Sequence, residues 1–240
     1  MLFKDGVLYH SLPKDLNDPF ECKPHYKHQS NGKEALAVRK LLEKMGRKNG
    51  FGFKKAKAFV SQSMANPQQF QQMLVEAQSY VYNKARVCCF TENNEHLLFW
   101  AHYANSHKGF CVEFNLEKMA TGGIYKVKYQ NDYPTVSYPP PEDDTMLSPV
   151  LIKSKVWEYE NEFRSIIYPK APAFLPETIT GIKLNNDSIK AVYFGQNIKP
   201  EHRDKIVSII KSGPFEPELW QAELKQDSYG INFKPYKLKV

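Results

Sequence analysis

The sequence predicts an α+β fold with a mixed or antiparallel sheet and an N-terminal helical insertion. Helical periodicity is concentrated between about residues 32 and 84, whereas most strand-like segments come after residue 86. The two kinds of segment show no regular β-α-β alternation, so a fully parallel sheet is not expected. No internal repeat is visible, and 240 residues can bury well over half of the surface of the unfolded chain. We therefore expect a single domain over residues 1–240.

The first third of the chain combines a strand, a turn and helices. Residues 6–12, GVLYHSL, predict a short strand, and residues 16–22, LNDPFEC, predict a turn because Pro19 keeps Asp18 out of the helical region. Apolar residues at helical spacing then predict an insertion of helices over about 32–84. Its first helix has one apolar and one basic face, and Pro67 suits the first turn of the third helix.

The remaining elements are mostly strands. The segment RVCCFTE from residue 86 predicts a buried strand, and NNEHLLFWAHYANSH from residue 93 predicts a helix with an Asn cap. We expect a mobile, proline-rich loop at about 131–149 and a helix or irregular segment before residue 160. The helix that follows the last buried strand should stop at Gly213. The expected strands lie at 108–115, 124–130, 160–169 and 188–195, with a terminal hairpin at 218–226 and 229–236.

Composition limits the environment and the partners. The chain has 33 Lys and Arg against 26 Asp and Glu, a net charge of +7, which favours an anionic partner or serves solubility alone. The four cysteines lack metal-ligand spacing, so buried free thiols in a reducing cytoplasm are expected and no metal site is predicted. No signal peptide or membrane-spanning run is visible, so no membrane partner is expected.

The stretch 155–167, KVWEYENEFRSII, places Glu160, Glu162 and Arg164 two positions apart. On a strand these side chains would point to one face, with neighbours about 6.6 Å apart. If that face is partly desolvated, each charge needs a partner, and a structural ion-pair ladder is the common result. The functional alternative is a pair of carboxylates in a cleft, which suits a reaction that develops positive charge. The pattern alone favours the ladder.

The segment 99–114, FWAHYANSHKGFCVEF, predicts a helix packed on the strand that follows it. Trp100 and Tyr103 are three residues apart and lie on adjacent parts of one helix face. A core helix explains Trp100, whereas the polar tip of Tyr103 makes it a candidate for stacking on a ring ligand. His102 lies about 200° around the helix from Trp100, and with His107 it is too weak a pair to predict a metal site.

The turn LNDPFE contains a third group of polar candidates. Asn17 and Asp18 can bond to their own backbone and form a tight turn without any ligand. Phe20 would then anchor the turn, and Glu21 would pair with a basic side chain. We expect the structural role to dominate here.

Four segments carry a family resemblance: LNDPFE, CCFTENNEHLLFWAHYANSHKGFCVEF, KVWEYENEFRSI and IKAVYFG. In this order they resemble an uncharacterised bacterial family, domain of unknown function 2971, over about residues 7–195. The order of motifs is also similar to that of toxin-type ADP-ribosyltransferases, an analogy at the level of the fold. Family members usually carry a further strand and helix before the turn. If that strand supplies a nucleotide-binding residue, the resemblance implies that Tyr9 or His10 replaces it or that catalysis is impaired. A start codon placed too late would give the same pattern.

The resemblance to ADP-ribosyltransferases implies a glycosyltransferase-type enzyme of toxin or phage-defence type that uses NAD as a substrate and needs no metal. Glu162 would stabilise the ribosyl cation, and Glu160 would orient the acceptor, a nucleic acid or a protein. Tyr103 would stack on nicotinamide, and Arg164 would hold the carboxylates or a phosphate. The candidate binding residues are Tyr103, Arg164, His102, Trp100, Asn17, Asp18, Glu21, Tyr9 and His10.

Two alternatives stay open. The same cleft could serve a non-catalytic module that recognises a nucleotide, another anionic small molecule or a protein, since charge and aromatic residues fit both hypotheses equally well. A nucleic-acid-processing enzyme ranks third, because it would need a carboxylate cluster around a divalent ion. The sequence offers only Glu160 and Glu162 close together, plus Asp18 and Glu21 if the fold brings them near.

Overall fold

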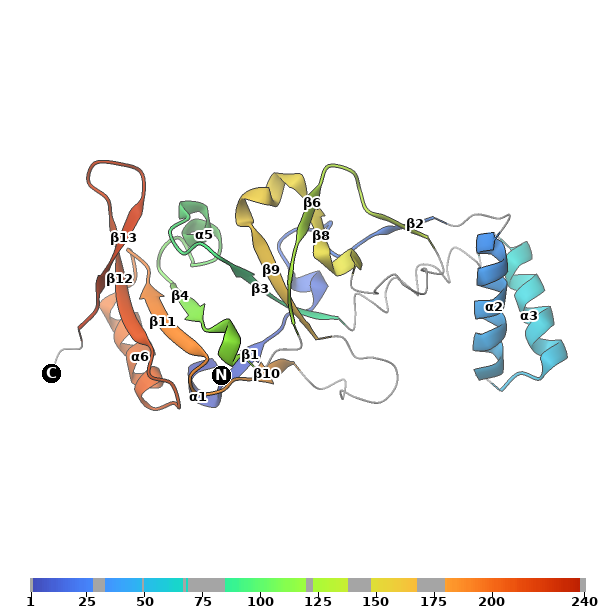
Figure 1. Ribbon diagram of the computed structural model, residues 1–240, viewed down its shortest axis with the longest axis horizontal. Coiled ribbons are helices and arrows are strands. Elements are labelled where there is room, and N and C mark those ends of the chain that lie inside the picture. Colours follow the sequence, from blue (N-terminus) through green and yellow to red (C-terminus); the bar gives the residue numbers. More distant parts are fainter. Residues whose placement is uncertain are drawn as a thin grey trace. The chain divides into compact units, whose positions relative to one another are not determined.

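The computed structural model describes residues 2–27, 33–48, 50–66, 68, 85–119, 123–137, 148–167 and 180–237. Contacts divide the chain into two compact units. The first unit comprises Met1–Ser11, Arg86–Tyr125 and Glu160–Val240, and the second comprises Leu12–Ala85 and Lys126–Tyr159. Both helices and mixed sheets are present, which confirms the α+β fold class (Figure 1). The single domain expected from the sequence stays a prediction.

The larger sheet of the first unit has four strands in the order β13-β12-β11-β4. The strands are β4 (Phe110–Phe114), β11 (Ile189–Phe194), β12 (Glu218–Leu224) and β13 (Ile231–Pro235). β11 and β12 are parallel because the helix α6 (Pro200–Lys211) connects them, whereas the pairs β11–β4 and β12–β13 are antiparallel. The terminal hairpin predicted from the sequence is thus confirmed.

The helix α6 covers one face of this sheet (Figure 1). Its buried residues Val207 and Ile210 pack in one hydrophobic cluster with Val192 and Phe194 of β11. The helix ends at Lys211, as the stop at Gly213 predicts. A Cβ atom at Gly213 would lie 1.9 Å from the carbonyl oxygen of Phe3, so only glycine allows this close approach to the N-terminal segment.

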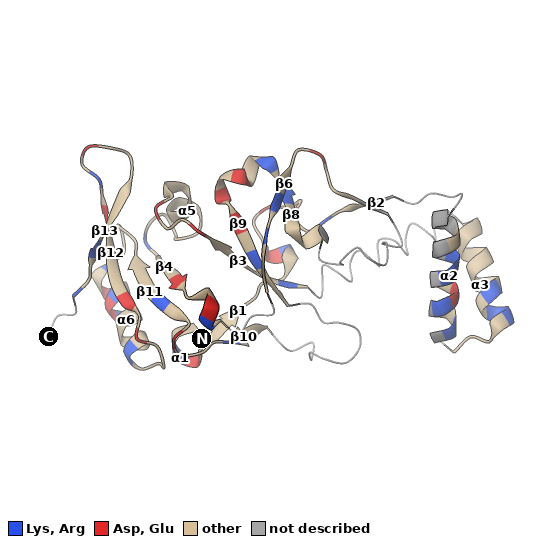
Figure 2. Cartoon of the chain, in the orientation of Figure 1, with Lys and Arg blue, Asp and Glu red and all other residues tan. Residues whose placement is uncertain are grey.

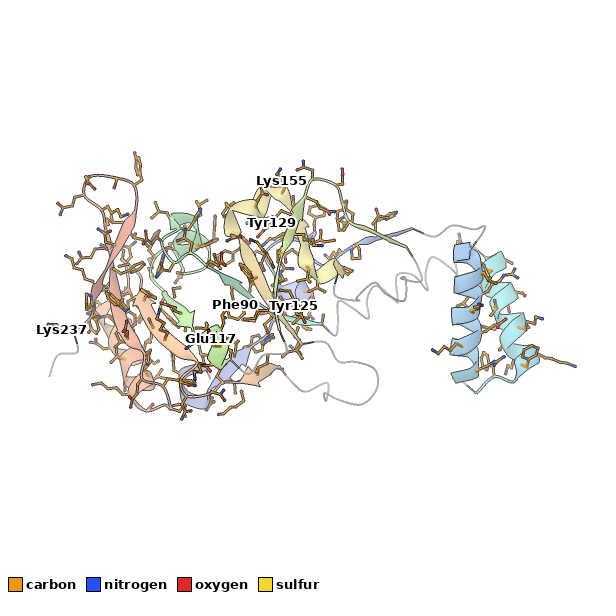
Figure 3. The ribbon with its side chains drawn as sticks, viewed as in Figure 1. Phe90, Glu117, Tyr125, Tyr129, Lys155 and Lys237 are labelled. Carbon is orange, nitrogen blue, oxygen red and sulfur yellow. The ribbon has the colours of Figure 1, made fainter. Side chains whose placement is uncertain are left out.

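A second sheet of the first unit carries the predicted charged segment. Its order is β3-β9-β5, with β3 (Arg86–Thr91), β9 (Glu162–Ile167) and β5 (Ile124–Lys126), and β3 and β9 are antiparallel. Phe90 of β3, labelled in Figure 3, meets Phe114 of β4 edge to face, with ring centroids 5.7 Å apart. The N-terminal segment forms α1 (Leu2–Asp5) and β1 (Val7–Tyr9), and β1 pairs with β10 (Gly181–Lys183).

The second unit contains short strands and a helical hairpin. β2 (His25–Lys27) pairs with β7 (Thr135–Ser137), and β6 (Lys128–Gln130) pairs with β8 (Ile152–Ser154), both in parallel. The helices α2 (Lys33–Lys48) and α3 (Phe53–Ala65) confirm two of the three helices expected in the insertion. Of the third, expected from residue 67, only Gln68 lies among the described residues. Short 3-10 helices complete the chain: η1 (Pro13–Asp15), η2 (Leu116–Lys118), η3 (Ser148–Leu151) and η4 (Lys155–Glu160).

Several expectations for individual elements are wrong in detail. The strand expected over 124–130 is divided between β5 and β6, which belong to different sheets, because the buried residue Val127 separates them. The strand β7 lies inside the segment expected to be a loop, whose residues 138–147 are outside the described part of the chain. The helix expected over 93–107 is only α5 (Leu97–His102), and it ends before three residues with positive φ, Asn105, Ser106 and His107.

The thiols are free, but their burial differs from the expectation. Cys22 is buried, Cys88 and Cys111 are partly buried, and Cys89 is exposed. The prediction of buried thiols is therefore wrong for Cys89. Burial raises the pKa of Cys88 to about 12 and that of Cys111 to about 11, so both stay protonated at neutral pH.

Candidate active site

The centre of the candidate site is a buried ion pair on β9. The guanidinium of Arg164 donates from Nε to Glu162 Oε1 at 2.6 Å and from Nη2 to Glu162 Oε2 at 3.0 Å. The Arg164 side chain is 0% exposed and that of Glu162 is 4% exposed. Such a fork-to-fork geometry is the strongest form of this pair and offsets part of the cost of burying both charges. Glu162 therefore has both carboxylate oxygens bonded to Arg164.

Glu160 does not share the strand with this pair. It is the last residue of η4, and Asn161 between it and β9 has φ +41°, in the left-handed region. The expectation that all three charges lie on one strand face is therefore wrong, because the strand begins only at Glu162. The turn is fixed by Thr91, whose hydroxyl donates to the Glu160 carbonyl at 3.1 Å, and by Asn161, whose amide donates to Glu92 at 2.8 Å.

The side chain of Glu160 meets the end of α5. Tyr103 follows directly after this helix, and its hydroxyl Oη donates to Glu160 Oε1 at 2.5 Å. Glu160 is 4% exposed, whereas Tyr103 is 52% exposed. A charge-assisted hydrogen bond thus connects a buried carboxylate with an aromatic ring at the surface.

The aromatic ring of Tyr103 belongs to a row of rings along α5. The centroid distances are 4.8 Å between His96 and Phe99, 6.1 Å between Phe99 and Tyr103, and 6.4 Å between Tyr103 and His102. These are normal distances for tilted and edge-to-face pairs. We call His96, Phe99, His102 and Tyr103 the α5 aromatic row. A planar ligand could extend it by stacking on Tyr103.

Trp100 lies in the core instead. It is buried with Ala104 and Ile231, and its indole Nε1 donates to the Asn94 carbonyl at 2.7 Å. Its ring also contacts Phe233 of β13, with centroids 6.1 Å apart. Trp100 therefore attaches α5 to the four-stranded sheet and positions Tyr103 indirectly.

His10 contacts the other face of β9. Its Nε2 lies 3.0 Å from the hydroxyl oxygen of Ser165, and its Nδ1 lies 3.0 Å from the Leu8 carbonyl. Burial lowers the pKa of His10 below 6.5, and the nearby Arg86 lowers it further, although the hydrogen bond to Leu8 acts in the opposite direction. A neutral ring with its proton on Nδ1 then donates to Leu8 and accepts from Ser165.

Ser165, the partner of His10, was not among the candidate site residues predicted from the sequence. Its position directly after Arg164 placed it on the opposite strand face, and a lone serine there carries no motif. Tyr9, the other candidate near the N-terminus, lies on β1 and is about half exposed. Of these two residues, His10 forms a side-chain contact with β9, through Ser165.

The turn candidates Asn17, Asp18 and Glu21 belong to the second unit. Asp18 Oδ1 accepts from the backbone N–H of Phe20 at 2.9 Å, as expected for a self-bonded turn. Glu21 is buried and pairs with Lys153 at 2.8 Å, while Asn17 is exposed. The basic partner expected for Glu21 is therefore Lys153.

Comparison with known proteins adds one match. Residues 99–165 match the family model described as Protein of unknown function (DUF2971). The match confirms the predicted resemblance to this family over residues 99–165, a part of the range of about 7–195 expected from the sequence. The DUF2971 match covers α5 from Phe99 onward, β4 and the β9 residues up to Ser165, and so includes Tyr103, Glu160, Glu162 and Arg164. No curated protein and no solved structure matches the chain.

In the described part of the chain, no three His, Cys, Asp or Glu side chains are grouped so that they could hold a metal ion. Neither does any helix among these residues have the length and apolar character needed to cross a membrane.

Proposed function

We propose that the first unit is an NAD-using enzyme of the ADP-ribosyltransferase type, with Glu160 as its central carboxylate. The observation that carries this proposal is the hydrogen bond from the half-exposed Tyr103 to the buried carboxylate of Glu160. It joins the two groups that the reaction requires, a ring surface for nicotinamide and a carboxylate for the ribosyl cation. Low exposure also strengthens the electrostatic effect of Glu160.

In this reaction the bond between ribose C1′ and the nicotinamide nitrogen breaks. Its electron pair leaves with nicotinamide, and an oxocarbenium ion forms on the ribose. The Glu160 carboxylate stabilises that positive charge, while Tyr103 stacks on the departing ring. Water or another nucleophile then attacks C1′ and loses a proton to solvent.

The roles of the two carboxylates are exchanged relative to the sequence-based hypothesis. Glu162 has both oxygens bonded to Arg164, so we assign it to positioning β9 and the turn at Asn161. Glu160 has an oxygen bonded to a residue that reaches the surface, so we assign it to the cation. The exchange is testable because it predicts which substitution removes activity and which removes stability.

The test is incubation of the purified chain with NAD and chromatographic measurement of free nicotinamide. Glu160→Gln should lower the rate about 100- to 1,000-fold, as expected for loss of one preorganised charged group. The matched control is Glu158→Gln, which makes the same change two residues earlier at an exposed position. The control should keep the rate of the unmodified protein, and both variants should keep its melting temperature within a few degrees.

A non-catalytic nucleotide-binding module is the second candidate. The α5 aromatic row favours it, because stacking rings support binding without any chemistry. Saturable NAD binding without release of nicotinamide would select the module. Equal rates for the unmodified protein and Glu160→Gln would exclude the assigned role of Glu160.

A further inference from the structure

The excess positive charge of the chain is located in one short segment. Residues 33–57 contain nine Lys and Arg against two Asp and Glu, so their net charge is +7, the same as that of the whole chain. The other residues contain 24 basic and 24 acidic side chains and are balanced. The segment forms α2 and the first part of α3, and Figure 2 shows Lys and Arg on both helices.

The two helices pack against each other through small and apolar residues. Leu42 of α2 and Ala56 and Val60 of α3 are buried. Gly46 of α2 allows a close approach, since a Cβ atom there would lie 3.3 Å from the Cβ of Ala56. This packing leaves the charged side chains in solvent, and the exposed ones are Arg39, Lys40, Lys44, Arg47, Lys54, Lys55 and Lys57.

The position of these charges does not favour the stability of α3. Lys54 and Lys55 lie in its first turn, which contains no acidic residue. The helix dipole places partial positive charge at this end, so cations there are unfavourable. The N-cap residue Gly52 offers no side chain to the free N–H groups either. Helix amides and lysines together therefore create a strongly positive surface.

An exposed aromatic ring lies within this surface. Phe53, the first residue of α3, is 62% exposed. The Arg47 guanidinium lies 5.5 Å and the Lys57 ammonium 5.7 Å from its ring centroid, and Lys55 lies 4.9 Å from the ring of Phe51. An exposed ring between cations can stack on a base while the cations bind the adjacent phosphates.

We propose that the α2–α3 hairpin binds single-stranded nucleic acid through Phe53 and the surrounding Arg47, Lys54, Lys55 and Lys57. Phosphate groups complement the net charge, and bases complement the ring. An anionic membrane complements the charge alone. A helix that binds a membrane inserts its apolar face, whereas the buried residues Leu42, Ala56 and Val60 are used in packing α2 on α3. This proposal does not depend on the NAD reaction.

The test uses the full chain and fluorescently labelled 20-nucleotide RNA and DNA single strands, with anisotropy measured between 50 and 200 mM salt. The triple variant Lys54→Gln, Lys55→Gln and Lys57→Gln removes three cations. Raising the salt concentration from 50 to 200 mM should weaken binding of the unmodified protein by a factor about 20 times larger than for the variant. The reason is that each lost phosphate contact lowers the slope of log affinity against log salt concentration by about 0.7.

The matched control is the triple variant Lys199→Gln, Lys205→Gln and Lys211→Gln in the α6 region. It removes the same charge from exposed positions of the first unit and should keep the original salt slope. An equal effect of both triple variants would show that only total charge matters and would overturn the proposal.

The ring is tested separately. Phe53→Ala should weaken binding about 5- to 150-fold, the range expected for loss of one stacked base, and Phe53→Tyr should restore it. Circular dichroism checks that the helices persist. Unchanged affinity in Phe53→Ala would overturn the proposal, as would binding to phosphatidylserine vesicles without binding to either oligonucleotide.

Discussion

The strand β9 and the α2–α3 hairpin carry charge in opposite ways. In β9, Glu162 and Arg164 are buried and form two hydrogen bonds with each other. In the hairpin, basic residues outnumber acidic ones nine to two over residues 33–57, and the Lys and Arg side chains whose burial is described are exposed. Burial requires charges to be paired inside the protein, whereas solvent allows an excess of one sign. Substitution in β9 should therefore change stability, and substitution in the hairpin should change binding.

The largest expected effect on stability is that of Glu162→Gln. The amide cannot neutralise the guanidinium of Arg164, which is 0% exposed. We expect a loss of about 3–5 kcal/mol in the free energy of unfolding, the usual cost of breaking a buried pair from one side. Urea denaturation followed by tryptophan fluorescence measures it. A loss below about 1 kcal/mol would mean that other groups compensate the charge of Arg164 and that the pair is not the main support of β9.

The buried His10 should make stability depend on pH. Burial lowers its pKa in the folded protein below the 6.5 of the unfolded chain. The stabilisation is therefore complete above pH 6.5 and is lost as pH falls toward the folded pKa, by about 1.4 kcal/mol per pH unit. Between pH 7.5 and 5.5 the unmodified protein should therefore lose more stability than His10→Gln. If the unmodified protein lost less unfolding free energy than the variant over this pH range, the pKa of His10 would be raised by folding, which would contradict a neutral buried His10.

Tyr103→Phe tests the connection between buried and exposed groups. The variant loses the hydrogen bond to Glu160, but half of the ring is exposed and water can replace the hydroxyl. We expect about 0.5–1.5 kcal/mol of destabilisation, whereas the Michaelis constant for NAD should change little because phenylalanine keeps the ring that stacks on nicotinamide. The control is Tyr9→Phe, a tyrosine of similar exposure on β1. Equal losses of stability in the two variants would show that the hydrogen bond from Tyr103 to Glu160 contributes nothing to stability.

Strand and helix patterns predicted much of the fold but not the conformation of single residues. An apolar run predicted the buried strand β11, helical spacing predicted α6, and alternation predicted the first strand of the terminal hairpin. The break at Asn161 left no signal, since asparagine at φ +41° depends on the bonds of Glu92 and Thr91 in the folded chain. The assignment of one strand face to Glu160 failed for this reason.

The candidate site shows the same limit. The sequence placed Glu162 and Arg164 on one strand face and named an ion pair, which the hydrogen bonds of the structure bear out. It could not identify Tyr103 as the partner of Glu160 or Ser165 as the partner of His10, because those contacts join residues 57 and 155 positions apart. Such pairs are set by how β1, α5 and β9 pack, which is not encoded in local spacing.

The smallest expected effect on stability is that of Lys54→Glu in the hairpin, and it is a gain, whereas Glu162→Gln in β9 causes a loss. Lys54→Glu places a negative charge in the first turn of α3, where the helix dipole favours it. We expect a stabilisation of α3 by about 0.3–1 kcal/mol, seen as slower hydrogen exchange of its amides, together with weaker binding of single-stranded nucleic acid. Ser61→Glu, near the other end of the helix, is the control and should not stabilise it. If Lys54 binds a ligand, its replacement should stabilise the helix and weaken binding. If Lys54 stabilises the fold, its replacement should destabilise the helix.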